Sequence, residues 1–291
     1  DESQIEPQIT DKTVAILAPN LMGNLCDWPE IRAIADKHNL IVIEDSADTL
    51  GATINGNISG FYSDMSITSF YGSHIINCAG NGGALAINDD KVMARAKLLR
   101  SWGRSSSLFD EQSEAIENRF NVNLEGIDYD AKFVFETIGY NLEGNEVGAA
   151  FGLAQLEKLN INIETRQRNF QKQCEFFSKY PEYFANPLET AGCETAWLAF
   201  PLLIKESAPF TRKDMQIFLE NRNIQTRVVF TGNILRQPMC KNVSLRVQNG
   251  GYPNADRVMK WGILLPVHHG LTESMFERFQ STIEEFIACF N

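Results

Sequence analysis

The stretch TVAILAPNLMGNLCDWPEIRAIADKHNLIVIED, residues 13–45, decides the fold. Two apolar runs, residues 13–18 and 40–43, flank residues 28–39, in which apolar side chains recur at the spacing of an amphipathic helix. We therefore predict a strand, a helix and a second strand. Nearly continuous apolar strands that alternate with helices are typical of a parallel sheet covered on both faces, where ligands gather at the carboxyl ends of the strands. Asp45 stands at such an end.

After this unit the alternation of strands and helices continues, and the predicted elements then become shorter. The next predicted elements are a strand at residues 65–70, a helix at 90–100, a long polar excursion at 103–130 and helices at 146–159 and 163–180. Shorter elements come after them: a strand at 197–204, a helix at 212–221 capped by Thr211, a strand at 225–229 and a closing helix at 273–289. We predict an α/β protein with a large domain at residues 1–158 and, at 159–291, a connecting helix and a smaller α+β domain.

The composition of the chain limits which binding partners and which cellular compartment we expect. The chain has 291 residues, 44% of them hydrophobic, and a formal net charge of -11 without a cluster of Lys and Arg, so we expect no nucleic-acid partner. No run approaches the roughly 18 apolar residues of a membrane span, and residues 1–10 are polar and acidic. The six cysteines are scattered without a CxxC pair, which indicates neither a zinc site nor a disulfide framework. We expect a soluble, cytoplasmic protein with no membrane partner.

Four side chains near the ends of predicted strands are candidates for chemistry. Asp45 either caps the following turn or is a buried carboxylate that pairs with a cationic ligand group. Ser69, Tyr71 and His74 place a hydroxyl, an aromatic ring and an imidazole on one passage from strand to loop. Ser69 can bind a phosphate group there. Because a histidine in such a place is more often structural than catalytic, the residues alone indicate a polar site around Asp45 and His74 and no particular reaction.

Five motifs together resemble a known family. They are IVIEDSADTLGATING at residues 41–56, ITSFYGSH at 67–74, GNGGALAIND at 80–89, GYNLEGNEVGAAFGLAQLEKL at 139–159 and LPVHHGLT at 265–272. Across almost the whole chain the sequence resembles the sugar-modifying branch of the fold-type I pyridoxal phosphate enzymes, the DegT/DnrJ/EryC1/StrS aminotransferases. The resemblance implies a mostly parallel sheet with helices on both faces, and the cofactor pyridoxal 5′-phosphate (PLP) or pyridoxamine 5′-phosphate (PMP).

The same resemblance implies the residues that hold the cofactor. In the family the aspartate of the IED motif pairs with the pyridine nitrogen, and the match is Asp45; Asp48 would lie near the ring hydroxyl. The serine of the SF motif binds the cofactor phosphate, and the match is Ser69. The asparagine of the GYN motif reaches the phosphate in the neighbouring subunit, and the match is Asn141. An enzyme of this kind is a homodimer with shared sites.

One departure from the family pattern points to the reaction. The aminotransferases have a lysine that binds PLP covalently at the position of His74. Residues 57–90 contain no lysine, so we expect no covalent link to the cofactor. This exchange resembles the nucleotide-sugar 3-dehydratases of deoxysugar and O-antigen biosynthesis. There PMP condenses with the 4-ketone of a nucleotide-linked 4-keto-6-deoxyhexose, the histidine acts as the catalytic proton acceptor, and the 3-hydroxyl leaves.

A second departure concerns metal. One type of dehydratase holds a [2Fe-2S] cluster on cysteines downstream of its WGR motif. The matching stretch here, SWGRSSSLFDEQ at residues 101–112, has no cysteine, and Cys78 and Cys174 are the nearest on either side. We therefore expect no iron-sulfur cluster and no other metal. An amino donor such as glutamate would then regenerate the amine of the cofactor.

Further departures leave alternatives open. Glu143 stands where the family has Arg or Lys, and Asn81 stands where it has Glu. Members of the family also carry a longer N-terminal segment with a phosphate-binding helix and an aromatic residue over the cofactor ring. We expect this chain to lack both and to bind the cofactor weakly by itself. The alternatives to a dehydratase are a nucleotide-sugar aminotransferase of the same family and a non-catalytic, truncated or degenerate member.

Overall fold

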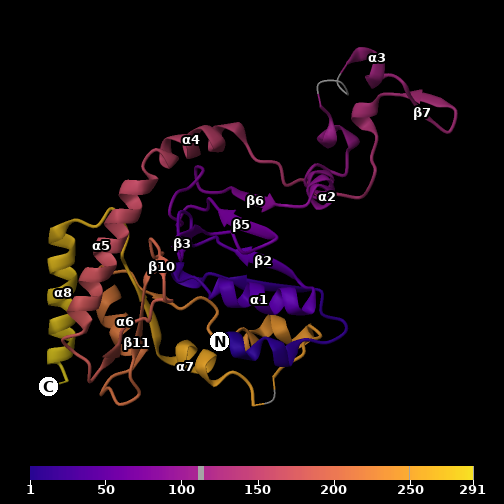
Figure 1. The fold of residues 1–291 in the computed structure, drawn as a ribbon. Coiled ribbons are helices and arrows are strands. Elements are labelled where there is room, and N and C mark those ends of the chain that lie inside the picture. The colour runs from indigo at the N-terminus through magenta and orange to yellow at the C-terminus, as the bar shows by residue number, and fades with distance from the viewer. Residues whose placement is uncertain (111–114, 249, 291) are drawn as a thin grey trace.

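A four-stranded sheet organises the N-terminal part of the chain (Figure 1). The computed structural model describes residues 1–110, 115–248 and 250–290. The sheet order is β1-β2-β5-β6, with β1, β2 and β5 parallel and β6 antiparallel to β5. Its strands are Ala15–Pro19 (β1), Ile41–Asp45 (β2), Met65–Ser69 (β5) and Gly83–Ile87 (β6). The α/β class is confirmed, and three strands lie within two residues of their predicted bounds. The sequence pattern does not predict β6.

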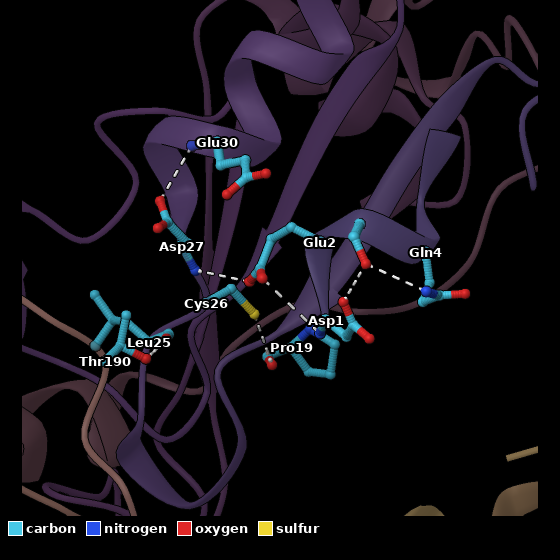
Figure 2. Close-up of polar contacts among 10 residues, drawn as sticks. Asp1, Glu2, Gln4, Pro19, Leu25, Cys26, Asp27, Glu30 and Thr190 are labelled. Atoms are coloured by element: carbon cyan, nitrogen blue, oxygen red, sulfur yellow. Dashed lines mark hydrogen bonds and ion pairs between the residues drawn. The ribbon is translucent and has the colours of Figure 1, made fainter. Parts of the chain in front are cut away.

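Helix α1, Trp28–His38, covers one face of this sheet. Asp27 caps its first turn, because Oδ1 accepts a hydrogen bond from the Glu30 amide at 3.1 Å. The Asp27 amide in turn donates to Oε1 of Glu2 at 3.3 Å, so the first residues of the chain hold the start of the helix (Figure 2). Asn39 ends the helix in the left-handed conformation, with φ 53°. The apolar side chains that the helix buries are Trp28, Ile31 and Ala35.

Alternation along β2 separates the two faces of the sheet. Val42 and Glu44 are buried on the face that α1 covers, whereas Asp45 points to the other face. The strand pairing places Leu17 and Leu85 on that second face, where they keep 60% and 47% of their surfaces exposed. The second face is therefore an apolar surface that has a carboxylate at its carboxyl edge.

A long arm leaves the sheet after helix α2, Asp90–Arg100 (Figure 1). It contains the excursion predicted at residues 103–130. Within it lie the short helix α3, Ile116–Arg119, and an antiparallel hairpin of β7, Val122–Leu124, and β8, Ile127–Tyr129. Residues 111–114 of the predicted excursion lie outside the described residues, and its described part projects away from the four-stranded sheet (Figure 1).

Two consecutive helices, α4 (Glu146–Leu156) and α5 (Leu159–Phe177), lead from the arm to an antiparallel sheet of order β12-β13-β11-β9. The remaining elements of this part are β9 (Phe184–Ala185), β11 (Phe200–Ile204), α6 (Arg212–Glu220), β12 (Arg227–Val228), α7 (Pro253–Trp261), β13 (Gly262–Leu265) and α8 (Glu273–Ala288). The helices and strands predicted here are confirmed with ends that differ by a few residues. Helix α7 and strands β9 and β13 were not predicted. Of the helices that the structure describes, none has the length and apolar character to cross a membrane.

Two apolar clusters lie on either side of the boundary predicted at residues 158 and 159. One gathers around α1 and β2, and the other gathers around α5, α8 and the second sheet. A small third sheet connects them, because β10 (Cys193–Glu194) pairs with β3 (Thr53–Ile54), which also pairs with β4 (Asn57–Ile58). The division into two domains therefore stays a prediction.

The turn at Met22 and Gly23 brings the two halves into close contact. Gly23 has φ 99°, and a Cβ atom there would lie 2.6 Å from Cα of Trp197, so only glycine fits. The Gly23 carbonyl accepts a hydrogen bond from Oγ1 of Thr195 at 2.6 Å, and the Met22 carbonyl accepts one from the Leu198 amide at 2.8 Å. The chain around Trp197 is therefore held directly against this turn.

Arg166 of α5 is buried at the same junction. Its Nη1 donates to the carbonyls of Trp197 and Leu198 at 3.2 and 3.1 Å, and its Nε donates to Nδ1 of His269 at 3.3 Å. Burial lowers the pKa of Arg166 to about 10. Burial also lowers the pKa of His269 to about 4, assisted by the positive charges of His268 and Arg166. The folded protein therefore disfavours a proton on His269.

Acid should destabilise the fold partly through His269. As the pH falls, the unfolded chain binds the proton first, because its histidine has the ordinary pKa of 6.5 whereas that of the folded chain is about 4. This contribution to the free energy of unfolding is present above pH 6.5 and is lost between pH 6.5 and pH 4. We expect urea unfolding of His269→Gln, which keeps an acceptor for Arg166, to lose less stability than wild type over that interval. His38→Gln on α1 is the matched control, and equal losses in wild type and His269→Gln would contradict the assignment.

Candidate active site

The carboxyl ends of two neighbouring strands bring two predicted residues together. Asp45 ends β2 and lies opposite Ile67 of β5, and Ser69 ends β5. Because side chains alternate along a strand, Asp45, Ile67 and Ser69 point to the same face of the sheet. The backbones stay in contact beyond Asp45, since the Ser46 amide donates to the Ile67 carbonyl at 2.8 Å. The predicted site therefore lies at the carboxyl edge of the parallel strands.

The carboxylate of Asp45 and the hydroxyl of Ser69 can each still bind a ligand. Oδ1 of the half-buried Asp45 accepts a hydrogen bond from the Ala47 amide at 3.1 Å, and no cation among the described residues pairs with this carboxylate. Oγ of Ser69 accepts one from the Tyr71 amide at 3.2 Å, and its hydroxyl hydrogen has no acceptor in the part of the chain that the structure describes. A carboxylate can bind a protonated ring nitrogen, and a hydroxyl can donate to a phosphate.

His74 and Asp48 face each other beside this edge. Nε2 of His74 lies 3.5 Å from Oδ1 of Asp48, whose Oδ2 accepts a hydrogen bond from the Met22 amide at 3.1 Å. The two side chains keep only 16% and 7% of their surfaces exposed. Nδ1 of His74 is buried and has no hydrogen-bond partner among the described residues. The Tyr71 ring stands edge-on to the imidazole, 5.9 Å away between centres. The imidazole therefore has one nitrogen next to a carboxylate and one nitrogen unused.

Opposing effects set the charge of Asp48. Burial raises its pKa, and the nearby Asp45 carboxylate adds to the rise. The charge of His74 and the Met22 amide act in the other direction. A carboxylate in such surroundings attracts a proton on Nε2 of His74, and this contact is the basis for assigning that tautomer. The family resemblance implies a place for Asp48 near the cofactor, and the structure adds its contact with His74.

Sequence reasoning missed the role of Glu44. This carboxylate is 1% exposed, and its Oε1 accepts hydrogen bonds from Asn20 Nδ2 at 2.9 Å, Ser46 Oγ at 2.6 Å and Ser59 Oγ at 2.7 Å. Its Oε2 accepts one from the Gly60 amide at 2.8 Å. These donors satisfy a buried charge and hold the end of β2 next to the site. A signal was available, since alternation in IVIED puts Glu44 on the covered face, where a carboxylate needs such partners.

The fifth predicted residue lies apart from the other four. Asn141 is exposed on the segment between the arm and α4, where its backbone bridges to Ser101. None of the contacts described for it reaches Asp45, Asp48, Ser69 or His74, which leaves four of the five predicted residues in one place.

Glu143, which reverses a charge of the family pattern, has partners within its own segment. Its Oε2 lies 3.4 Å from Nε of Arg100, and its Oε1 accepts a hydrogen bond from the Ser101 hydroxyl. A guanidinium therefore balances this carboxylate locally. Asn81, the other substituted position, is exposed.

The structure also bears on metal ligands. Within residues 1–110, 115–248 and 250–290, no group of three or more His, Cys, Asp or Glu side chains is arranged to hold an ion. The cysteines at positions 26, 78, 174, 193, 240 and 289 are free. The side chains at the sheet edge are a carboxylate, a hydroxyl and an imidazole that lies next to a second carboxylate.

Two sequence relatives align with nearly the whole chain. It is 34% identical over 288 residues to the lipopolysaccharide biosynthesis protein RfbH of Salmonella typhimurium, covering 98% of this chain and 65% of that protein. It is 32% identical over 287 residues to the dTDP-4-dehydro-2,6-dideoxy-D-glucose 3-dehydratase of Saccharopolyspora spinosa, covering 98% of this chain and 62% of that protein. The chain thus spans less than two thirds of the length of each of these relatives.

A solved structure and a family comparison agree with this likeness. The Escherichia coli GDP-4-keto-6-deoxy-D-mannose-3-dehydratase with bound hydrated PLP has a TM-score of 0.83 and 27% identity, over 97% of this chain and 70% of that one. The fold predicted from the motifs, that of a PLP-dependent transferase, is confirmed. The DegT/DnrJ/EryC1/StrS aminotransferase family matches residues 1–284. The chain therefore belongs to the DegT/DnrJ/EryC1/StrS aminotransferase family.

Proposed function

We propose that this chain belongs to a PLP- and PMP-dependent enzyme that removes the 3-hydroxyl group of a nucleotide-linked 4-keto-6-deoxyhexose. The observation that carries the proposal is His74, which replaces the family's lysine. Its Nε2 lies beside Asp48, and its buried Nδ1 has no hydrogen-bond partner among the described residues. Two of the related proteins are 3-dehydratases of keto-deoxysugars, which supports this substrate class. The pathway we propose is deoxysugar biosynthesis for lipopolysaccharide, in the cytoplasm.

The residues at the strand edge fit the cofactor. Asp45 offers a carboxylate oxygen to a protonated ring nitrogen, and Ser69 offers a hydroxyl to a phosphate. When bound as PMP, the cofactor supplies an amine for the sugar 4-ketone and a ring that accepts electrons. Asp45 stabilises the positive charge of the ring nitrogen, and Ser69 fixes the phosphate end. Two anchors on neighbouring strands therefore orient the ring.

His74 holds and moves the proton. Asp48 lies next to Nε2, so Nδ1 is the nitrogen that remains to accept a proton from carbon. An imidazole exchanges protons near neutral pH, and a positioned general base contributes roughly a hundredfold to ten-thousandfold in rate. Asp48 stabilises the positive charge that His74 acquires. The proton on Nδ1 is then available to the departing 3-hydroxyl group, and the burial of both side chains limits competition from water.

A sugar aminotransferase of the same family is the alternative reaction. It needs an amine that binds PLP covalently, and lysine is absent from residues 57–90, which contain β5 and the loop with His74. Dehydration is therefore favoured. The partners in the proposal are the nucleotide sugar and an amino donor such as glutamate. The absence of an iron-sulfur cluster stays a prediction from the cysteine-free stretch at residues 101–112.

We also propose a homodimer built on helix α4. Val147 and Leu153 keep 79% and 67% of their surfaces exposed, while Gly152 packs against Cys78. The segment before α4 also exposes large side chains, at Ile138, Tyr140 and Leu142. Contiguous exposed apolar side chains of this kind are typical of an interaction surface. Asn141 lies exposed just before this helix, so pairing of two copies through α4 gives it a route to the site of the partner.

Replacing His74 should change how the cofactor is held. We expect borohydride treatment of the wild-type protein with PLP to label no peptide from residues 57–90, because imidazole forms no stable imine. The variant His74→Lys should yield a labelled peptide that carries position 74. His38→Lys on α1 is the matched control and should yield none. Mass spectrometry of the digests reads the outcome, and a labelled wild-type peptide from this region would refute the assignment.

Removing the carboxylate of Asp48 should slow proton transfer. We expect Asp48→Asn to reduce deuterium exchange from solvent into the methylene group of bound PMP by about tenfold or more, because nothing then stabilises the charge on His74. In wild type the exchange should fall as the pH drops through the raised pKa of Asp48, and the variant should lack that limb. Asp36→Asn, an exposed carboxylate on α1, is the control. Unchanged deuterium exchange in Asp48→Asn would show that the contact between Asp48 and His74 contributes only to packing.

A charge on α4 should separate the subunits. We expect wild type to be a dimer by light scattering and Leu153→Asp to be a monomer with an unchanged circular dichroism spectrum, because the carboxylate would be buried unpaired in the interface. Leu188→Asp is the matched control, since Leu188 is 89% exposed outside this surface. A dimer that survives Leu153→Asp would place the interface elsewhere.

A further inference from the structure

Asn81 and Gly82 form a chemically labile pair in the loop between His74 and β6. The chain has three Asn–Gly pairs, at residues 55–56, 81–82 and 249–250. In such a pair the amide nitrogen of the glycine can attack the side-chain carbon of the asparagine, because no Cβ on the glycine hinders the approach. Position 249 lies outside the described residues, so the structure compares the first two pairs.

Both reacting groups of the pair at residues 81 and 82 are unrestrained. The two residues are exposed, and the Asn81 side chain makes no hydrogen bond with any residue that the structure describes. The Gly82 carbonyl accepts a hydrogen bond from the Phe70 amide at 2.9 Å, but the Phe70 carbonyl accepts from the Cys78 amide at 3.0 Å. Within the described part of the chain the Gly82 amide therefore has no acceptor. A free amide and a free side chain can reach the short separation that the attack requires.

The pair at residues 55 and 56 is held in place. Asn55 and Gly56 form the turn between β3 and β4, whose end residues Ile54 and Asn57 pair with each other. The Asn55 amide donates to the Gly192 carbonyl at 2.8 Å. Oδ1 of Asn55 packs against the same glycine, where a Cβ atom would lie 2.2 Å from it. These contacts restrain both the backbone and the side chain, which opposes the attack.

The loop around Asn81 supports the chain that follows β5. On one side of Asn81 the Gly80 carbonyl accepts a hydrogen bond from the Gly72 amide at 3.1 Å. On the other side the Gly82 carbonyl accepts the one from Phe70 at 2.9 Å. The separation of these two carbonyls along the backbone therefore determines whether both hydrogen bonds can form.

We propose that Asn81 is a site of spontaneous modification to isoaspartate, which loosens the chain directly after Ser69. The Gly82 nitrogen bonds to Cγ of Asn81, and Nδ2 leaves as ammonia with the proton of the Gly82 amide, so that a succinimide ring forms. Water then opens the ring at either of its two carbonyl groups. Opening at the side-chain carbonyl gives aspartate, and opening at the main-chain carbonyl gives isoaspartate. The reaction needs no oxidant, reductant or enzyme.

The two products should affect the loop differently. Isoaspartate adds a methylene group to the backbone between the carbonyls of Gly80 and Gly82, so the hydrogen bonds to Gly72 and Phe70 no longer form together. Aspartate leaves the backbone length unchanged and should keep both. Any consequence for the cofactor rests on the proposed role of Ser69, whereas the modification and the loosening of the loop do not.

Peptide mapping of the full chain during mildly alkaline incubation tests the site. We expect Asn81 to lose ammonia at least about tenfold faster than Asn55, because only Asn81 is free to reach the attack geometry. Isoaspartyl methyltransferase should then label the peptide that contains position 81. Asn81→Gln should remain unlabelled, since its longer side chain cyclises slowly. Asn242→Gln, at an exposed asparagine that no glycine follows, is the matched control and should label as wild type does.

Amide hydrogen exchange tests the loosening of the loop. In protein enriched in isoaspartate, the amides of Phe70 and Gly72 should exchange faster than in fresh protein. Fresh Asn81→Asp and incubated Asn81→Gln should keep the original protection. Equal conversion at Asn81 and Asn55, no isoaspartate at position 81, or unchanged exchange at Phe70 and Gly72 in the isoaspartate form would each overturn the proposal. None of these results depends on the borohydride and deuterium-exchange experiments at positions 74 and 48.

Discussion

The buried carboxylate of Glu44 is the constraint on which the candidate site depends. Its donors are Asn20 directly after β1, Ser46 in the turn after β2, and Ser59 and the Gly60 amide in the segment before β5. One charge, removed from water on the covered face of the sheet, therefore ties three pieces of chain to the end of β2. Leaving any one of these donors out would cost about 1–3 kcal/mol, because a charged group would lose a buried partner.

Because side chains alternate along β2, the orientation of the buried Glu44 carboxylate determines where the next residue, Asp45, points. With Glu44 fixed toward α1, Asp45 has to point to the opposite face, where Ser69 ends the adjacent strand. The consecutive carboxylates Glu44 and Asp45 therefore have different roles, one structural and one available to a ligand. Glu44 has partners for both of its oxygens, and Asp45 keeps an oxygen for a ligand.

The junction between the two halves of the chain positions Asp48, the partner of His74. The turn at Met22 and Gly23 holds Asp48 through one backbone amide and holds the chain at Thr195 and Leu198 through its carbonyls. The same turn therefore orients Asp48, the partner of His74, and fixes how the two halves of the chain meet. A shift of the C-terminal part that moves this turn would also move Asp48, which lies against His74.

Sequence by itself determined the α/β class, the first strand-helix-strand unit and the cluster of Asp45, Ser69 and His74 near strand ends. Such local patterns follow from side-chain periodicity and from motifs whose residues are close along the chain. It also determined that residues 57–90, which include His74, contain no lysine, because residue order is read directly from the sequence.

Only the tertiary structure decided which side chains meet. The contact between Asp48 and His74 depends on strand register, and the hydrogen bonds of Glu44 depend on which face α1 covers. Strand β6 escaped prediction because glycine and alanine carry little strand preference, and its pairing with β5 is what makes it a strand. The separation of Asn141 from the other site residues likewise follows from the path of the arm, since no local pattern encodes where a long excursion returns.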